Sequence, residues 1–187
     1  MIFEYISLIF GIIKTYIYKI LNPTKIHFKG IPKINSSFKI AIKKNSKLYL
    51  GKKFRSRYNV SFRIYNKGKV TIGNNCFFND GCSINCQDEI IIGNNVICGQ
   101  NVMLFDHDHD YKNNINNFVT KKITIGNNVW IGANSIILKG VTIGDNVVIA
   151  ANTVVKENIE SNVLVYNTLK LQKKKIDLNK TQGGDIE

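Results

Sequence analysis

The sequence predicts an all-β protein, a parallel β-helix of about five to six triangular coils, and three observations lead to that prediction. Apolar residues recur every six positions, small or β-branched residues lie four positions after each of them, and Gly-Asn-Asn or Gly-Asp-Asn triplets mark the turns. A six-residue period fits neither an α-helix nor a simple two-faced strand. It fits short strands joined by tight corners, three to a coil of about 18 residues, with the coils stacked through backbone hydrogen bonds.

The repeat can be followed through twelve hexads, and the first position of each is apolar: Ile72, Phe78, Ile84, Ile92, Cys98, Leu104, Ile125, Ile131, Ile137, Ile143, Ile149 and Val155. Four positions further along, Asp88 and Asp108 are the exceptions in a mostly small or β-branched series. We expect the glycines after the large residue, such as Gly73 and Gly93, to give the corners flexibility. Asparagines are expected to adopt left-handed backbone angles.

Three segments follow from this pattern: an N-terminal amphipathic helix over residues 1–22, the β-helix over residues 23–165, and a charged C-terminal extension over residues 166–187. Weaker hexads extend the repeat upstream through Leu50, Phe62 and Val70. The length suits a single well-buried domain. The extension leaves the repeat, so its end is expected to fray.

The N-terminal segment is strongly apolar as far as Leu21, and Asn22-Pro23 would end its helix. Its apolar run is too short to span a membrane, and no basic residues precede it as they would in a signal peptide. Polar or small residues trace one narrow stripe along it: Glu4, Ser7, Gly11, Lys14 or Thr15, and Lys19. Two interpretations stay open. The helix lies in a membrane interface, or it packs on the rest of the protein or on a partner subunit.

The net charge of +13 is unevenly distributed. No Asp or Glu occurs between Tyr5 and Asn79, whereas sixteen Lys or Arg lie between Lys14 and Lys69. Such a basic half suits phosphate groups, in nucleic acid, anionic lipid or a nucleotide cofactor, and it is equally compatible with a solvated surface. Because no nucleic-acid-binding motif accompanies the charge, a nucleic-acid partner is not expected.

The four cysteines lie within 23 residues and form no CxxC pair: Cys76, Cys82, Cys86 and Cys98. A zinc site would need two such pairs or added histidines at ligand spacing, so no metal is expected. Three of the cysteines fall on inward positions of the repeat. Buried free thiols predict a reducing, cytoplasmic location, with peripheral contact at the inner face of the membrane as an option.

The repeat breaks between residues 106 and 124, where a polar loop is expected to protrude from the scaffold. This stretch contains His107 and His109, and the phase of the hexads points both away from the coil interior. A neutral imidazole suits general-base catalysis, and Asp106 and its acidic neighbours could orient it. A metal site or a plain polar loop are the alternatives, although His27, the third histidine, lies outside the repeat.

At this point the sequence resembles the hexapeptide-repeat acyltransferases, in the branch of the galactoside and maltose acetyltransferases and the polysaccharide O-acetyltransferases. The resemblance covers roughly residues 68–165 and rests on the Ile-Gly-Asn-Asn-Val segments that start at Ile92 and Ile125, on Asn-Val-Met-Leu from Asn101, and on the acidic-histidine loop. It implies left-handed winding, acetyl-CoA as acyl donor, direct transfer without an acyl-enzyme, and a homotrimer with the site between subunits. By position after Asn101, it gives His109 as general base and His107 as the second candidate.

The same resemblance implies the remaining site residues. Asn79 matches an acceptor contact, and Gln87 stands where the family has an acidic one. The CoA contacts fall on Trp130, Ala133, Ala151, Lys156 and Lys170. Lys156 is one place early, and the Gly, Pro and Ala that precede the last lysine in the family are absent here. Trp130 is equally compatible with a corner cap.

Together these observations predict an O-acetyltransferase acting on a sugar hydroxyl of a capsular, exopolysaccharide or lipopolysaccharide unit. N-acetylation of an amino sugar, or acetylation of a free sugar or antibiotic, are alternatives within the same enzyme class. A zinc protein like the γ-carbonic anhydrases, or a non-catalytic β-helical scaffold, are alternatives of another class.

Overall fold

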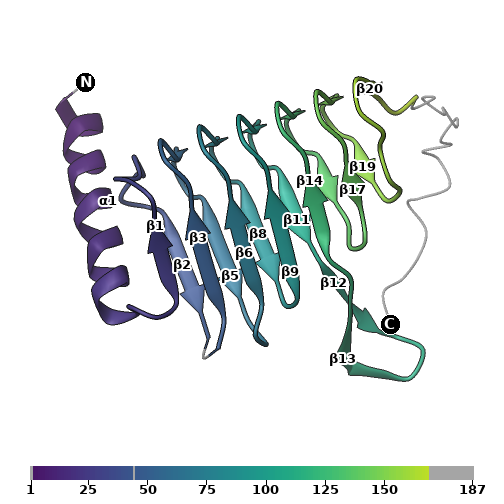
Figure 1. Cartoon of the computed structure of the whole chain (residues 1–187), viewed down its shortest axis with the longest axis horizontal. Helices are drawn as coiled ribbons and strands as arrows, with labels where there is room; N and C mark the ends of the chain where they lie inside the picture. The colour runs from purple at the N-terminus through teal and green to yellow at the C-terminus, as the bar shows by residue number, and fades with distance from the viewer. Residues whose placement is uncertain (1, 44, 169–187) are drawn as a thin grey trace, which may run out of the picture.

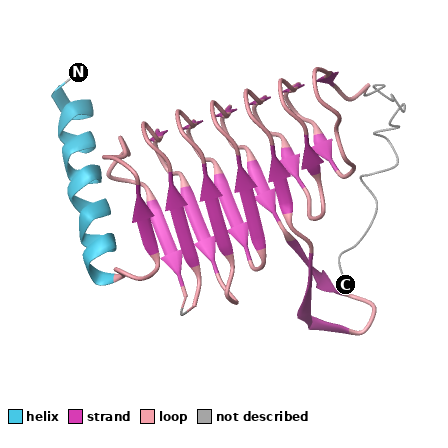
Figure 2. Ribbon diagram, viewed as in Figure 1, coloured by secondary structure: helices cyan, strands magenta, loops and turns pink. Residues whose placement is uncertain are grey.

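The computed structural model describes residues 2–43 and 45–168, and it forms a left-handed parallel β-solenoid with one helix at its N-terminal end (Figures 1 and 2). Three parallel sheets of six strands each make the three sides of the prism, so the described chain completes about six coils. The predicted fold class and number of coils are confirmed.

Each sheet takes one strand from every coil. Sheet A contains β1 (Ile26–Phe28), β3 (Lys47–Leu50), β6 (Lys69–Ile72), β9 (Glu89–Ile92), β14 (Ile123–Ile125) and β17 (Thr142–Ile143). Sheet B contains β4 (Arg55–Ser56), β7 (Phe77–Phe78), β10 (Ile97–Cys98), β15 (Trp130–Ile131), β18 (Val148–Ile149) and β20 (Leu164–Val165). Sheet C contains β2 (Lys39–Ile42), β5 (Ser61–Ile64), β8 (Ser83–Cys86), β11 (Met103–Phe105), β16 (Ile136–Ile137) and β19 (Val154–Val155).

The coil length departs from the prediction in the N-terminal half. Leu48 pairs with Val70, 22 positions later, whereas Ile125 pairs with Ile143, 18 positions later. The predicted 18-residue coil is therefore right only for the later coils. The early coils contain extra corner residues, and these make the upstream hexads look weak in the sequence.

The core fills the inside of the prism with the residues that the repeat predicts. All twelve first-position residues are buried, with at most 3% of their surface exposed. The four cysteines are buried as well. The exceptions, Asp88 and Asp108, are exposed because both lie near the corner between sheets C and A, where extra residues shift the phase. Each fully buried Phe or Ile contributes about 1.5–3 kcal/mol.

The corners work differently from the expectation for glycine. Eleven of the thirteen non-glycine residues with positive φ in the described chain are asparagines, which confirms their left-handed role. Gly73 and Gly93 have no positive φ; they are stacked on glycines of the next coil instead. A Cβ on Gly73 would lie 2.4 Å from the carbonyl oxygen of Gly93. Close approach of successive coils, and not corner flexibility, requires these glycines.

The helix α1 (Ile2–Leu21) lies across the first coil. Its stripe of small and polar residues faces the solenoid. The Ser7 and Ser36 hydroxyls lie 2.7 Å apart, and Gly11 and Thr15 are buried. Among the described residues, no helix is long and apolar enough to cross a membrane.

The predicted protrusion at residues 106–124 is present and forms an antiparallel hairpin of β12 (His107–Asp110) and β13 (Asn114–Thr120). It leaves the prism at the corner between sheets C and A (Figure 1). Sheet B is the side of the prism opposite to that corner. The hairpin therefore points away from sheet B.

Candidate active site

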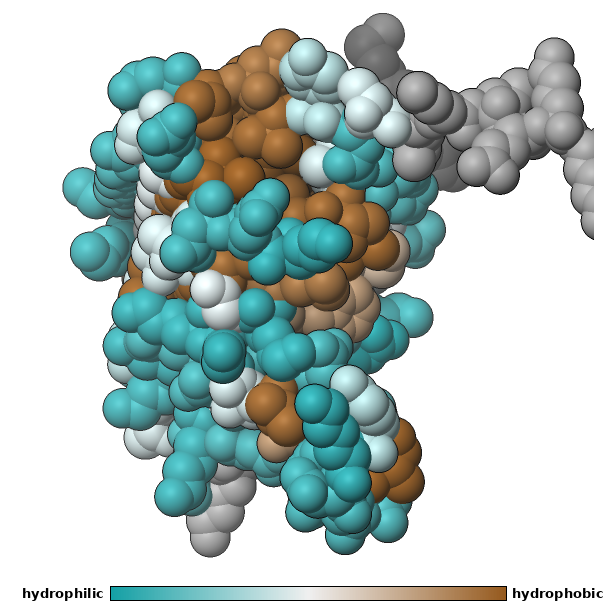
Figure 3. All heavy atoms as spheres, turned by 90° about the vertical axis from the view of Figure 1, so that its right-hand side faces the viewer, coloured by the Kyte–Doolittle hydropathy of each residue, from teal (hydrophilic) through white to brown (hydrophobic). Residues whose placement is uncertain are grey.

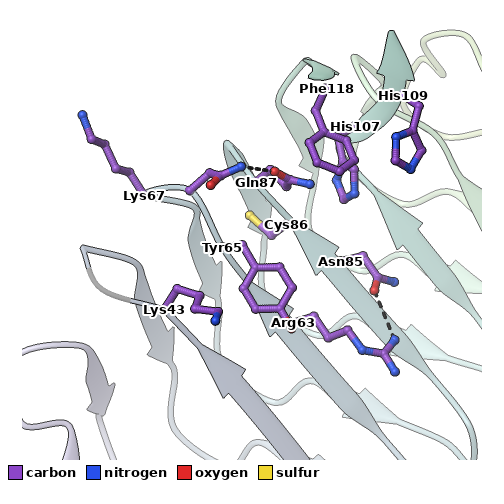
Figure 4. Close-up of a pocket in the computed structure, with 11 residues that line it drawn as sticks. Lys43, Arg63, Tyr65, Lys67, Asn85, Cys86, Gln87, His107, His109 and Phe118 are labelled. Atoms are coloured by element: carbon purple, nitrogen blue, oxygen red, sulfur yellow. Dashed lines mark hydrogen bonds between the residues drawn. The ribbon is translucent and has the colours of Figure 1, made fainter. Parts of the chain in front are cut away.

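A polar pocket lies at the foot of the hairpin, with a volume of about 660 Å³ (Figure 4). The hairpin contributes His107, His109 and Phe118. The corners of the earlier coils contribute the rest: Lys43, Arg63, Tyr65, Asn66, Lys67, Asn85, Cys86 and Gln87. Both predicted histidines and Gln87 thus share one pocket.

His107 is held by a buried carboxylate. Its Nδ1 lies 2.9 Å from Oδ1 of Asp106, whose side chain is fully buried. The same carboxylate accepts hydrogen bonds from the backbone N–H groups of Gln87 and Asp88, at 2.8–3.0 Å. Because the carboxylate is an acceptor, the Nδ1 of His107 donates. Asp106 therefore fixes the orientation of His107 and ties the hairpin to the preceding coil.

His109 is held by a carbonyl. Its Nδ1 lies 2.6 Å from the backbone oxygen of Ile115 on the opposite strand of the hairpin, so Nδ1 again carries the proton. The ring packs against Phe118 at a centroid distance of 4.6 Å, and His107 packs edge-on against the other side of the pair at 5.1 Å. Within the described chain, neither Nε2 has a protein hydrogen-bond partner, so each neutral ring presents a free acceptor.

The two histidines differ in exposure. His109 is exposed at the outer part of the pocket, whereas the side chain of His107 is only 16% exposed beneath the hairpin. Beside the hairpin, the Lys139 ammonium pairs with the Asp108 carboxylate. An acceptor molecule that enters the pocket from solvent meets His109 first.

The pocket is basic on the side away from the hairpin. Lys43, Arg63 and Lys67 surround Tyr65, and Arg63 donates to the Asn85 side chain at 3.4 Å. The Asn66 amide donates to Oε1 of Gln87, as Figure 4 shows. Asp106 is the carboxylate next to this pocket, and its oxygens are already engaged.

The buried thiols are unsuited to nucleophilic catalysis. Burial raises the pKa of the Cys82 thiol to about 11, and burial together with the negative charge of Asp106 raises the pKa of Cys86 well above its usual range. Burial also raises the pKa values of Cys76 and Cys98. A thiol that stays protonated near neutral pH is a poor nucleophile.

The residues predicted to contact CoA gather elsewhere, in a shallow groove on sheet B with a volume of about 490 Å³. Trp130, Ala133 and Ala151 line it together with Gly99 and Gly132. Trp130 is 56% exposed on the flat side of the prism, so it forms a groove wall and not a corner cap. Side chains this small leave a smooth wall against which a slender chain such as pantetheine could lie.

The structure separates other predicted residues from their expected neighbours. Asn79 lies in the sheet B groove and not beside Gln87. Lys156 is exposed after β19 and does not line the groove, and Lys170 lies outside the described residues. His27 stacks on Tyr49 in the first coil, far along the solenoid from the hairpin.

An apolar ladder runs along the outer surface of sheet B beside this groove. Neighbouring coils place in register Phe77, Ile97, Trp130, Val148 and Leu164. Trp130, Ile97 and Leu164 are about half exposed or more. Figure 3 shows apolar side chains gathered toward the top of the molecule, the side on which β20 and the other short strands of sheet B lie in Figure 1.

Sequence reasoning did not find Lys43, Arg63, Tyr65 and Phe118. A signal for part of this set was present, since Lys43, Tyr65 and Gln87 are spaced by 22 residues, the length of the early coils. Phe118 depends on the register of the hairpin, which pairs it with His109.

Comparison with known proteins agrees with this architecture. Residues 122–157 match the family model described as bacterial transferase hexapeptide (six repeats). No curated protein matches the chain.

Three solved structures illustrate the shared fold. The N-acyltransferase AntD from Bacillus cereus, in complex with dTDP-4-amino-4,6-dideoxyglucose and coenzyme A, is 20% identical, covers 89% of this chain and 92% of its own, and has a TM-score of 0.67. A hexapeptide-repeat acetyltransferase of Vibrio cholerae, in complex with acetyl-CoA, is 21% identical over 81% of this chain and 71% of its own, with a TM-score of 0.53. A maltose O-acetyltransferase from Clostridium difficile 630 is 31% identical over 73% of this chain and 64% of its own, with a TM-score of 0.50. The predicted resemblance is confirmed.

Proposed function

The chain is a hexapeptide-repeat protein with a left-handed β-helix, and on that premise we propose that it is an acetyl-CoA-dependent O-acetyltransferase. Its acceptor is a sugar hydroxyl, in a capsular, exopolysaccharide or lipopolysaccharide unit. The observation that carries the proposal is the pair of oriented imidazoles, each with a free Nε2, over an open polar pocket on this scaffold.

His109 acts as the general base. Its Nε2 removes the proton of the acceptor hydroxyl as the hydroxyl oxygen attacks the thioester carbonyl carbon. The new C–O bond forms, the C–S bond breaks, and the leaving CoA sulfur takes the proton back from the imidazolium. The carbonyl of Ile115 keeps the ring oriented throughout. The protonated state of the buried thiols supports direct transfer, with no acyl-cysteine.

The basic side of the pocket supports an acceptor with negative charge. Lys43, Arg63 and Lys67 would bind a phosphate or carboxylate, and Tyr65 offers a ring face to a sugar. An acidic glycan, or a sugar carried on a diphosphate, has this chemistry.

We propose that the catalytic unit is a homotrimer. In one chain the histidine pocket and the sheet B groove lie on opposite sides of the prism, so the acyl donor in the groove cannot reach His109 of the same chain. A head-to-tail contact, in which the hairpin of one chain meets sheet B of the next, joins the two halves. Such contacts must close into a ring, and three triangular prisms close one. The exposed apolar ladder on sheet B supports this contact.

Two substitutions test the catalytic assignment. His109→Ala should lower acetyl transfer from labelled acetyl-CoA about 10²–10⁴-fold while the far-ultraviolet circular dichroism stays unchanged. His107→Ala serves as the matched variant. Loss of activity in His107→Ala with retention in His109→Ala would move the base to His107.

A mixing experiment tests the shared site. His109→Ala leaves the groove intact, and Ala151→Trp, at an exposed position, fills the groove and leaves the histidine intact. Each variant alone should be inactive, and mixed trimers refolded together should regain about a quarter of the activity, because one site then has both halves. No recovery in verified mixed trimers would place the site within one chain.

N-acylation of an amino sugar is the second candidate. AntD, with which the chain shares its fold over 89% of its length, is an N-acyltransferase in complex with a nucleotide-linked amino sugar. Assays with hydroxyl and amino acceptors side by side separate the two reactions.

A further inference from the structure

The helix α1 is packed with its polar side inward. The Lys14 ammonium donates to the carbonyl of Ser36 at 3.0 Å. At Gly11 the helix approaches the first coil so closely that a Cβ would lie 2.1 Å from the carbonyl oxygen of Ile34. These contacts fix the rotation of the helix about its own axis.

The apolar side of the helix consequently faces outward. Six aliphatic or aromatic residues on this side are 43–73% exposed: Ile6, Ile9, Phe10, Ile13, Ile17 and Ile20. This arrangement is the reverse of an ordinary surface helix, which buries its apolar stripe against the core. An exposed apolar stripe of this length on a folded protein marks an interaction surface.

The surroundings of the helix are basic. At the same end of the solenoid, a cavity of about 550 Å³ beside Ile31 is lined by Lys29, Lys33, Lys52, Lys53 and Arg55, without a carboxylate. Ile31 itself is 62% exposed. The sequence contains no Asp or Glu between Tyr5 and Asn79. An apolar stripe beside a cationic rim matches the acyl chains and phosphates of a bilayer that contains anionic lipid.

We infer that α1 docks this protein onto the surface of an anionic membrane. The helix lies across the end of the solenoid (Figure 1), so a docked helix runs parallel to the bilayer and the solenoid stands away from it. Phe10 and its neighbours enter the interface, and the lysines of the rim contact headgroup phosphates. In a ring of parallel prisms, all such helices face the same membrane. This last consequence rests on the proposed homotrimer; the docking of one chain does not.

A second copy of the chain is a poorer match for the same surface. Two copies that meet end to end through α1 would bring their cationic rims together, and the described residues supply no carboxylate there to pair with them. An anionic surface removes that repulsion. The charge therefore favours lipid over self-association.

Vesicle cosedimentation tests the inference without using the acyl-transfer activity. The wild-type chain should bind vesicles of phosphatidylcholine with phosphatidylglycerol, and bind phosphatidylcholine alone much more weakly. The triple variant Phe10→Ser, Ile13→Ser, Ile17→Ser should lower binding by about tenfold or more, because the apolar contribution is lost. Tyr166→Ser is the matched control, since Tyr166 is equally exposed (63%) but lies at the other end of the solenoid. Lys29→Gln with Lys52→Gln should remove much of the preference for anionic vesicles.

A spectroscopic readout keeps the test independent of those variants. Trp130, the single tryptophan, lies on the side of the prism, so its emission should not change when wild-type protein binds vesicles. Phe10→Trp should add emission that shifts to shorter wavelength on anionic vesicles. The inference fails if the triple variant binds like the wild type, or if the emission added by Phe10→Trp does not move. It also fails if the triple variant lowers the molecular mass in lipid-free solution without affecting vesicle binding, which would identify a second copy as the partner.

Discussion

Replacing Asp106 by Asn should destabilise the protein and also disturb the site. The carboxylate is fully buried and accepts from two backbone N–H groups and from Nδ1 of His107. An amide has one oxygen to accept with. If that oxygen faces Gln87 and Asp88, the new NH₂ group faces His107, and the ring must then accept at Nδ1 and carry its proton on Nε2.

The size of the effect follows from these contacts. Two charge-assisted bonds become neutral ones, at a cost of about 1 kcal/mol each, and a mismatched donor pair adds about 1–3 kcal/mol. Relief of the buried charge offsets part of this, so we expect a net loss of about 2–4 kcal/mol in the free energy of unfolding. The matched control is Asp108→Asn, where the carboxylate is half exposed and pairs with Lys139 at the surface. That change should cost less than about 1 kcal/mol.

Urea unfolding followed by circular dichroism measures both variants. The midpoint should move for Asp106→Asn with little change in the slope. Acetyl transfer by the folded Asp106→Asn protein should fall only modestly if His109 is the base, because His109 is oriented by Ile115. Equal stability of the two Asn variants would show that Asp106 does not anchor the hairpin.

Three further predictions follow from the geometry. Gly11→Ala should lower Tm in spite of the better helix propensity of Ala, because its Cβ collides with the Ile34 carbonyl, whereas Ile9→Ala on the outward face should leave Tm nearly unchanged. Arg63→Gln should raise KM for an acidic acceptor about tenfold and leave KM for a neutral sugar unchanged, as steady-state kinetics would reveal; equal effects on both would deny Arg63 a role in charge recognition. The pKa of Cys82 is raised to about 11 in the folded chain, so its contribution to stability is fully present below about pH 9 and is lost as the pH rises toward 11, by about 3 kcal/mol in all; in urea titrations, Cys82→Ala should lack that part of the alkaline decline.

Much of the fold could be predicted because one side chain per hexad has to be apolar. Ile72 through Val155 kept this pattern, and every predicted position is buried. The coil length was harder to predict. Extra corner residues such as Asn66 and Lys67 are exposed, and exposed residues leave no hydrophobic signal.

The site could be predicted only in its parts. His107 and His109 were found because they break the repeat, and Trp130, Ala133 and Ala151 because they keep it within a recognisable motif. Their separation onto opposite sides of the prism depends on which coil side each residue occupies. The corner insertions control that, so Asn79 and Gln87 were predicted together but lie apart.

The helix at the start of the solenoid also bears on aggregation. Strands β1 and β2 end their sheets, and a parallel solenoid presents at each end a row of backbone N–H and C=O groups on which another chain can add strands. By lying across the first coil, α1 obstructs that growth at one end. Removal of the helix should therefore convert a discrete particle into one that elongates, and light scattering over time would detect the fibres.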